Sequence, residues 1–240
     1  MRGHIVLAAT LAGMTATSAA GQGLEGLGST SLSGQSLLLI ATVTLLSLAP
    51  GIAVMVTCFP FIVTVLSILR QAIGLQQSPP NMLIVSLSLF LSWFIMEPVL
   101  AQAWSDGVSP FLDGAIAPSE AFERGVAPFQ IFMAGRTDPD TFLELAALRP
   151  ETSGASDMAG APLSLLIPSF MLSEISRAFE IGFLIYLPFL IIDMVVSAVL
   201  MAMGMMMVPP AVVSLPFKLA FFVVADGWTL ISSALVRSYF

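Results

Sequence analysis

Residues 36–69 read SLLLIATVTLLSLAPGIAVMVTCFPFIVTVLSIL and contain no charged side chain. A span of about 20 apolar residues is enough to cross the hydrocarbon core of a bilayer, and this run would extend roughly 50 Å as one straight helix. Pro50-Gly51 and Pro60 lie inside it, so we expect a kinked or broken helix. The run predicts an α-helical membrane protein.

The composition of the whole chain agrees with this prediction. Of 240 residues, 57% are hydrophobic and 10% are charged, whereas soluble proteins carry roughly a quarter charged residues. The formal net charge is −7, and surfaces that bind nucleic acid are basic. We therefore expect contact with membrane lipid and no nucleic-acid partner.

The residues before this run are typical of a secretory signal. Arg2 supplies positive charge, Ile5 to Met14 form an apolar core, and Ser18-Ala19-Ala20 offer small residues for cleavage. The alternative is an uncleaved anchor helix, although the apolar core is short for a bilayer span. We predict a signal peptide over residues 1–20 and a flexible leader, rich in Gly and Ser, over 21–35.

A second apolar run, Met82 to Met96, follows a turn at Pro79-Pro80 and is closed by Glu97-Pro98. Together the two runs predict a first helical hairpin over residues 36–103. Arg70 lies in the loop between the runs, where the positive-inside rule favours the cytoplasmic side.

The region between residues 104 and 162 is hydrophilic and acidic, with nine acidic residues and three arginines. One helix is indicated there, because Asp138 is a suitable N-cap, Pro139 suits the first helical position and Pro150 would end the helix. We predict a small, partly ordered periplasmic insert, with no catalytic domain of its own.

The remainder, 163–240, is apolar again and is divided into two helical arms by Pro209-Pro210. The predicted fold is therefore an all-α membrane protein in which two helical hairpins with kinked helices flank a small acidic periplasmic insert.

Charged side chains interrupt this last region at membrane depth, where each costs roughly 2.5 to 3.5 kcal/mol unless it is paired or hydrated. They include Glu174, Arg177, Glu180, Asp193, Lys218 and Asp226. The spacing of the first three lets Arg177 reach both carboxylates on one side of a helix. Lys218 has no acidic neighbour along the chain, and Glu174 and Asp193 are its candidate partners. The alternative is that these charges extend into the lipid headgroups.

A cluster of methionines, at positions 201, 203, 205, 206 and 207, precedes Pro209-Pro210 and is interrupted by Gly204. Methionine is flexible and adapts to irregular surfaces. The cluster could therefore close a pore that yields to a passing polypeptide, or it could be an apolar turn packed against its neighbours.

The sequence lacks the motifs of common catalytic sites. The only histidine is His4 and the only cysteine is Cys58, which excludes a zinc-protease motif, a Ser/His/Asp triad and a thiolate metal site. Asp193 and Asp226 are the one pair to consider for an intramembrane aspartyl site, and they lack a recognisable motif. We expect no enzyme activity, no metal and no cofactor.

Several stretches carry a family resemblance. They are SEISRAFEIGF (173–183), YLPFLIID (186–193), MGMMMVPP (203–210), LPFKL (215–219) and DGW (226–228), with LRQAIG (69–74) and PPN (79–81) upstream. These stretches resemble the FliP family of flagellar biosynthetic proteins, from about Ser36 onward and most specifically in the last third.

The resemblance implies a core subunit of the flagellar type III protein export gate. Such a subunit lies in the bacterial inner membrane, multi-pass, at the flagellar basal body. It forms a ring with FliQ and FliR, near FlhB and FlhA, through which unfolded flagellar subunits pass. By this resemblance Met205, Met206 and Met207 form a gasket around the pore, and Glu174 and Lys218 form a charge pair between neighbouring subunits.

Three alternatives remain at this point. One is the equivalent subunit of an injectisome, the virulence type III system, although the signal peptide and Pro209-Pro210 favour the flagellar member. Another is a proton-coupled transporter with Asp193 and Glu174 as relay groups. The third is a purely structural membrane scaffold.

Overall fold

A computed structural model describes residues 32–74, 79–152, 157–205 and 207–240, and all regular structure in these ranges is helical. The predicted signal peptide, most of the predicted leader, and Met206 lie outside the described residues. The helices are α2 (Leu32–Met55), α3 (Phe59–Ile73), α4 (Asn81–Ala103), the π-helical segment η2 (Trp104–Val108), α5 (Ser109–Leu112), α6 (Pro118–Arg136), α7 (Pro139–Ala147), α8 (Leu163–Ala202), α9 (Pro210–Val224) and α10 (Gly227–Arg237).

The chain divides into two compact units, residues 1–50 and 51–240. In the first unit, α2 begins at Leu32, so it includes the last four residues of the predicted leader. The described side chains of this part of α2 are exposed and largely apolar; they include Leu37, Ile40 and Val43.

Within the described residues, two helical stretches are long and apolar enough to cross a membrane, Asn81–Leu112 and Leu163–Ala202. The bent pair of α9 and α10 adds a third if it is counted as one span. The prediction of an all-α membrane protein is therefore confirmed.

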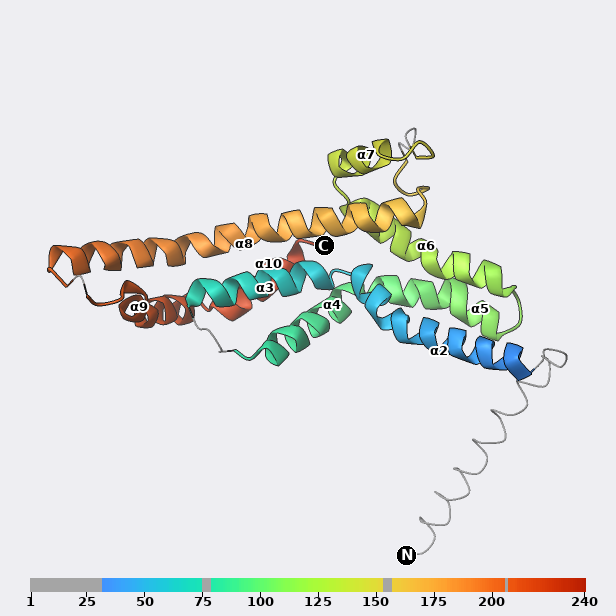
Figure 1. The fold of residues 1–240 in the computed structure, drawn as a ribbon, viewed down its shortest axis with the longest axis horizontal. Helices are drawn as coiled ribbons and strands as arrows, with labels where there is room; N and C mark the ends of the chain where they lie inside the picture. The colour runs from blue at the N-terminus through green and yellow to red at the C-terminus, as the bar shows by residue number, and fades with distance from the viewer. Residues whose placement is uncertain (1–31, 75–78, 153–156, 206) are drawn as a thin grey trace, which may run out of the picture. The chain divides into compact units, whose positions relative to one another are not determined.

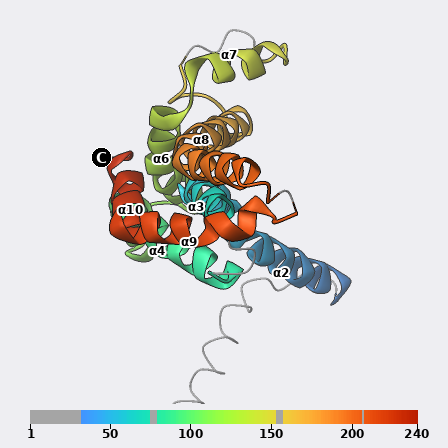
Figure 2. The same ribbon diagram turned by 90° about the vertical axis from the view of Figure 1, so that its left-hand side faces the viewer.

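The core of the second unit is built on α3. Its buried residues, such as Phe61, Val65 and Leu69, recur every three to four positions and form one continuous face. This face packs against α8, which lies alongside α3 (Figures 1 and 2). The expected break between the first two helices falls at residues 56–58, so Pro60 occupies the first turn of α3, where its missing N–H costs no hydrogen bond.

The helix formed by the second apolar run, α4, is longer than the sequence indicated. We expected the apolar run to close at Glu97-Pro98, but α4 continues through Pro98 to Ala103. Ile95 and Met96 before the proline are buried, and Ala103 after it is buried too. Burial of this face on both sides of Pro98 compensates for the single backbone hydrogen bond that a proline removes.

The acidic insert is more helical than its Pro and Gly content indicated. The predicted helix after the Asp138 N-cap is present as α7. The sequence did not indicate α6, a longer helix that carries Pro128 in its interior and packs against α4 and α8. Gly107 allows η2 and α6 to approach closely, because a Cβ on Gly107 would lie 2.7 Å from the Gly125 Cα.

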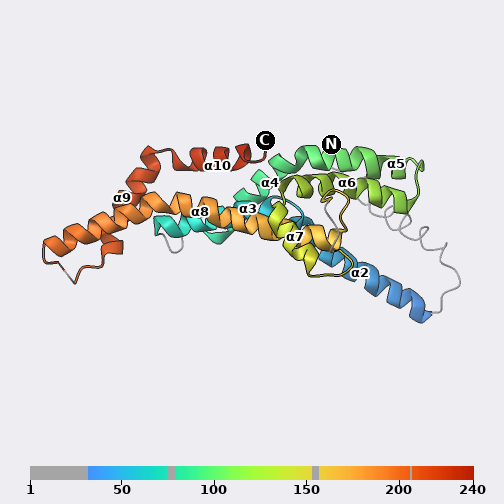
Figure 3. The same ribbon diagram turned by 90° about the horizontal axis from the view of Figure 1, so that it is seen from above.

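The last region contains one long helix and two short ones. α8 contains Pro168 and Pro188, and the predicted division at Pro209-Pro210 separates it from α9. The second arm, expected to be one helix, bends by 61° between α9 and α10 (Figure 3). Asp226 takes a left-handed conformation at this bend, and a Cβ on Gly227 would lie 2.2 Å from the Phe222 ring.

Candidate functional site

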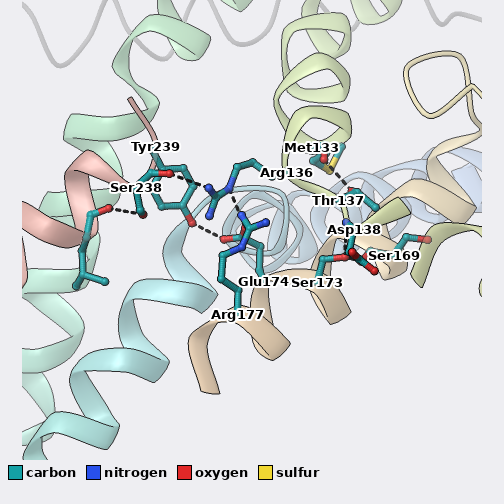
Figure 4. Close-up of polar contacts among 11 residues, drawn as sticks. Met133, Arg136, Thr137, Asp138, Ser169, Ser173, Glu174, Arg177, Ser238 and Tyr239 are labelled. Carbon is teal, nitrogen blue, oxygen red and sulfur yellow. Dashed lines mark hydrogen bonds and ion pairs between the residues drawn. The ribbon is translucent and has the colours of Figure 1, made fainter. Parts of the chain in front are cut away.

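A buried carboxylate, Glu174, is the centre of the first charge cluster. It lies in α8 with none of its surface exposed. Arg136 Nε donates to Glu174 Oε1 at 3.0 Å, and the Arg177 guanidinium lies 3.8 Å from the same oxygen. The Tyr239 hydroxyl donates to Glu174 Oε2 (Figure 4). We call Arg136, Glu174, Arg177 and Tyr239 the Glu174 cluster.

Arg136 connects the C-terminal residues of the chain to this cluster. It is the last residue of α6, and its Nη1 donates to the Ser238 carbonyl oxygen at 2.8 Å. Its guanidinium carbon lies 4.0 Å from the centroid of the Tyr239 ring, which is a cation–π contact. Burial, and then the negative charge of Glu174, raise the pKa of Tyr239, so the phenol stays protonated and can donate. The cluster thus joins α6, α8 and the residues that follow α10.

The corner between α6 and α7 is fixed to α8 one residue before Glu174. The Asp138 backbone N–H donates to Ser173 Oγ at 2.9 Å, and the Ser173 hydroxyl donates to the Ser169 carbonyl at 2.8 Å (Figure 4). Because Arg136 is two residues before Asp138, this contact helps to hold Arg136 beside Glu174.

A second cluster surrounds Lys218, a buried lysine of α9. Its Nζ donates to Asp193 Oδ2 at 2.6 Å and to the Ala72 carbonyl oxygen at 3.0 Å. Ser214 Oγ donates to Asp193 Oδ1 at 2.5 Å. Ala72 is in the last turn of α3, where free carbonyl groups and the helix dipole favour a cation. We call Ala72, Asp193, Ser214 and Lys218 the Lys218 cluster.

The predicted membrane-depth charges separate into paired and unpaired groups. Glu174, Arg177, Asp193 and Lys218 have partners within the chain. Among the described residues, Glu180 and Asp226 have no ion pair or side-chain hydrogen bond, and both are exposed.

Glu174 and Lys218 lie in different clusters of the single chain. Lys218 is bound to Asp193, which lies roughly 28 Å from Glu174 along α8 at 1.5 Å per residue. The charge pair between subunits therefore stays a prediction.

The methionine loop, residues 203–209, connects α8, which ends at Ala202, to α9, which begins at Pro210. Gly204 has a φ of 74°, and the N–H groups of Gly204 and Met205 bond the carbonyls of Met201 and Leu200, which is a Schellman ending for α8. Met203 is 68% exposed and Met207 is 98% exposed. Met205 lines an apolar cavity of about 540 Å³ between α8 and α9. Flexible apolar side chains are therefore presented at the end of this hairpin.

Sequence reasoning missed Arg136 and Tyr239 as site residues. Arg136 counted only as one of three basic residues in the acidic insert, and Tyr239 follows the last helix. Each is separated from Glu174 by dozens of residues, so no helical spacing connects them. The one signal in the sequence was that Glu174 needed a partner at membrane depth.

These features define an all-α membrane protein whose buried charges join distant helices. The described residues contain no group of three or more His, Cys, Asp or Glu side chains that could hold a metal ion. The sequence model that describes the FliP family matches residues 42–235, so the chain belongs to the FliP family.

Three relatives named flagellar biosynthetic protein FliP illustrate this membership. The protein from Caulobacter vibrioides is 49% identical over 205 residues, which cover 84% of this chain and 75% of the relative. The protein from Rhizobium meliloti is 47% identical and covers 82% and 80% of the two chains. The Bacillus subtilis protein is 42% identical and covers 84% and 90%. The chain is thus a membrane protein of flagellar biosynthesis and not an enzyme.

Proposed function

We propose that this protein is a pore-forming subunit of the flagellar type III export gate. It lies in the inner membrane at the flagellar basal body and conducts unfolded flagellar subunits out of the cytoplasm. It assembles in several copies with FliQ and FliR, next to FlhB and FlhA. The family membership supports a flagellar rather than an injectisome role.

The methionine loop is the observation that carries this proposal. An exposed apolar side chain costs free energy in water, roughly in proportion to its apolar area, yet Met203 and Met207 are largely exposed in the single chain. Methionine side chains of several copies can close a pore against ions, and because they are flexible they can yield to a chain that passes through. Met205, Met206 and Met207 form this gasket in the proposed gate.

Replacement of Met205, Met206 and Met207 by glycine tests the gasket. Removal of the apolar seal should let ions leak through the membrane while flagellar subunits are still exported, because the proposed pore itself remains. The leak is measured as loss of membrane potential with a voltage-sensitive dye, and export is measured as flagellin in the medium. Met194→Ala is a matched control, since Met194 is equally apolar and 61% exposed on α8 but lies outside the loop. A membrane that stays tight in the triple variant would contradict the gasket.

The Lys218 cluster favours one other function, a proton-coupled transporter. Asp193 and Lys218 are an ion pair at membrane depth, a common feature of proton paths. That function predicts that Asp193→Asn abolishes flux in the protein alone, reconstituted in vesicles without partners. In the export gate the same change should weaken packing of α9 on α8, and the isolated protein should carry no flux.

A further inference from the structure

Glu180 is an exposed carboxylate in an apolar surface of α8. It lies on the side of α8 that faces away from α3, since Ala178 and Gly182 face α3. Its neighbours Phe179 and Phe183 are each 60% exposed. Among the described residues Glu180 has no ion pair and no side-chain hydrogen bond. A carboxylate in such a surface is costly next to lipid unless a cation reaches it.

Arg237 is the complementary exposed cation. It ends α10 and lines a groove of about 690 Å³ between α10 and α4. The α4 wall of this groove is apolar, and includes Leu87, Leu91 and Phe94. Within the described part of the chain Arg237 has no ion pair either. The groove thus offers an apolar wall with a free guanidinium at its edge.

The two charges lie at a similar height along the helices. Ile181, next to Glu180, lines one cavity together with Ala234 and Leu235, which are three and two residues before Arg237. Their heights therefore agree to within roughly two helical turns, or about 10 Å. In a ring of copies whose symmetry axis runs parallel to the helices, rotation from one copy to the next keeps each residue at its height. Such a ring can therefore bring Glu180 of one copy and Arg237 of its neighbour together.

We infer that the α8 face around Glu180 of one copy docks into the α4–α10 groove of the next copy, where its carboxylate pairs with Arg237. The inference rests on the proposed function, because it needs an assembly of several copies. The contact is heterologous: the α8 face of each copy meets the groove of its neighbour, as in a closed ring. Phe179 and Phe183 cover the apolar wall, and the ion pair fixes the register of the two surfaces.

One other carboxylate competes for Arg237. Glu97 lies one helical turn beyond Phe94 on α4, beside the groove, and forms no ion pair with Arg237 in the chain. Asp226 lies at the opposite end of α10, roughly 17 Å away. The test therefore includes Glu97→Gln, which should leave the contact between copies intact.

Cysteine cross-linking tests the contact directly. Cys58 is the only cysteine, so Cys58→Ala gives a background in which Glu180→Cys and Arg237→Cys are combined in one chain and co-expressed with FliQ and FliR. Oxidation should give dimers and higher products on a denaturing gel, and each single cysteine should give no ladder. Glu123→Cys with Arg237→Cys is the control, because Glu123 is exposed but lies on α6.

Charge reversal keeps the test independent of the Cys58 substitution. Glu180→Arg or Arg237→Glu alone should lower the yield of assembled complex about tenfold or more, since like charges then face each other. The double reversal should restore the yield. An assembled complex that forms no ladder, or a cross-link only within one chain, would overturn this contact and leave the export gate standing. A wild-type protein that does not assemble at all would overturn both.

Discussion

Glu174 is a carboxyl group in the interior of the protein, with none of its surface exposed. Removal of a carboxylate from water costs several kcal/mol, and its partners must restore this free energy. Arg136 supplies one charged hydrogen bond, Tyr239 supplies a second donor, and Arg177 adds a more distant positive charge. At the scale of single residues, stability therefore depends on keeping these partners together.

Arg136→Ala should lower the free energy of unfolding by about 3–5 kcal/mol, because it leaves the Glu174 charge buried without its main partner. The measurement is unfolding of the purified protein in detergent, followed by circular dichroism. Arg124→Ala is the control: its pair with Glu120 is exposed on both sides, and such pairs contribute only about 0.2–1 kcal/mol. Equal losses in the two variants would show that Arg136 does not stabilise Glu174.

Asp138 should make the start of α7 sensitive to acid. The Thr141 backbone N–H, and then its hydroxyl, donate to this exposed carboxylate and lower its pKa from the ordinary value of 3.8. The folded pKa is below the unfolded one, so this stabilisation is complete above the unfolded value and is lost as pH falls through the folded value. Amide hydrogen exchange of α7, corrected for its intrinsic pH dependence, should show constant protection above about pH 5 and lower protection below the ordinary pKa of 3.8.

Asp138→Asn provides the comparison for this prediction. Asparagine keeps the cap acceptor but does not titrate, so the loss of α7 protection in acid should be smaller than in the wild type. An identical acid response in both proteins would assign the effect to another group.

At the scale of helices, the contact between α3 and α8 organises the second unit. It contains Phe61, Val65 and Leu69 on α3 and Ala178 on α8. Gly182 on α8 lets the two helices approach, since a Cβ there would lie 2.4 Å from Ile68 Cδ1 and 3.3 Å from Ile68 Cβ. Such distances are shorter than van der Waals contact, so either the Ile68 side chain or the helices would have to shift.

Gly182→Ala should therefore lower the free energy of unfolding by about 1–3 kcal/mol, the usual cost of overpacking. In a double-mutant cycle with Ile68→Ala, the combined loss should be smaller than the sum of the two single losses. Gly135→Ala is the matched control, because the space around Gly135 is open and alanine favours a helix. Additive losses at Gly182 and Ile68 would mean that the two residues do not meet.

The helices were the part of the fold that the sequence predicted best. Apolar runs, proline pairs and the Asp138 cap are local signals, and they placed α3, α7, α8 and the break at Pro209-Pro210. The continuation of α4 through Pro98 and the whole of α6 were missed. Both depend on packing between distant segments, which outweighs the local preference of proline.

At the scale of the whole molecule, the charged residues were predicted one by one, but most of their partners were not. The spacing of Glu174 and Arg177 in one helix indicated their contact, and Asp193 was one of two candidates for Lys218. No periodicity joins Arg136 or Tyr239 to Glu174, because Arg136 precedes α8 in the sequence and Tyr239 follows it. Only the fold brings the three side chains together. The proposed contacts between copies are further still from any local pattern.

Native mass spectrometry, after gentle detergent purification of the protein co-expressed with FliQ and FliR, tests the central claim most directly. The proposed export gate predicts a complex with several copies of this chain and with both partners bound. Unpaired apolar and charged surfaces, such as the methionine loop and the α4–α10 groove, would then be covered by neighbours. A stable monomer or dimer that is indifferent to FliQ and FliR would contradict the export gate and favour a transporter that works alone.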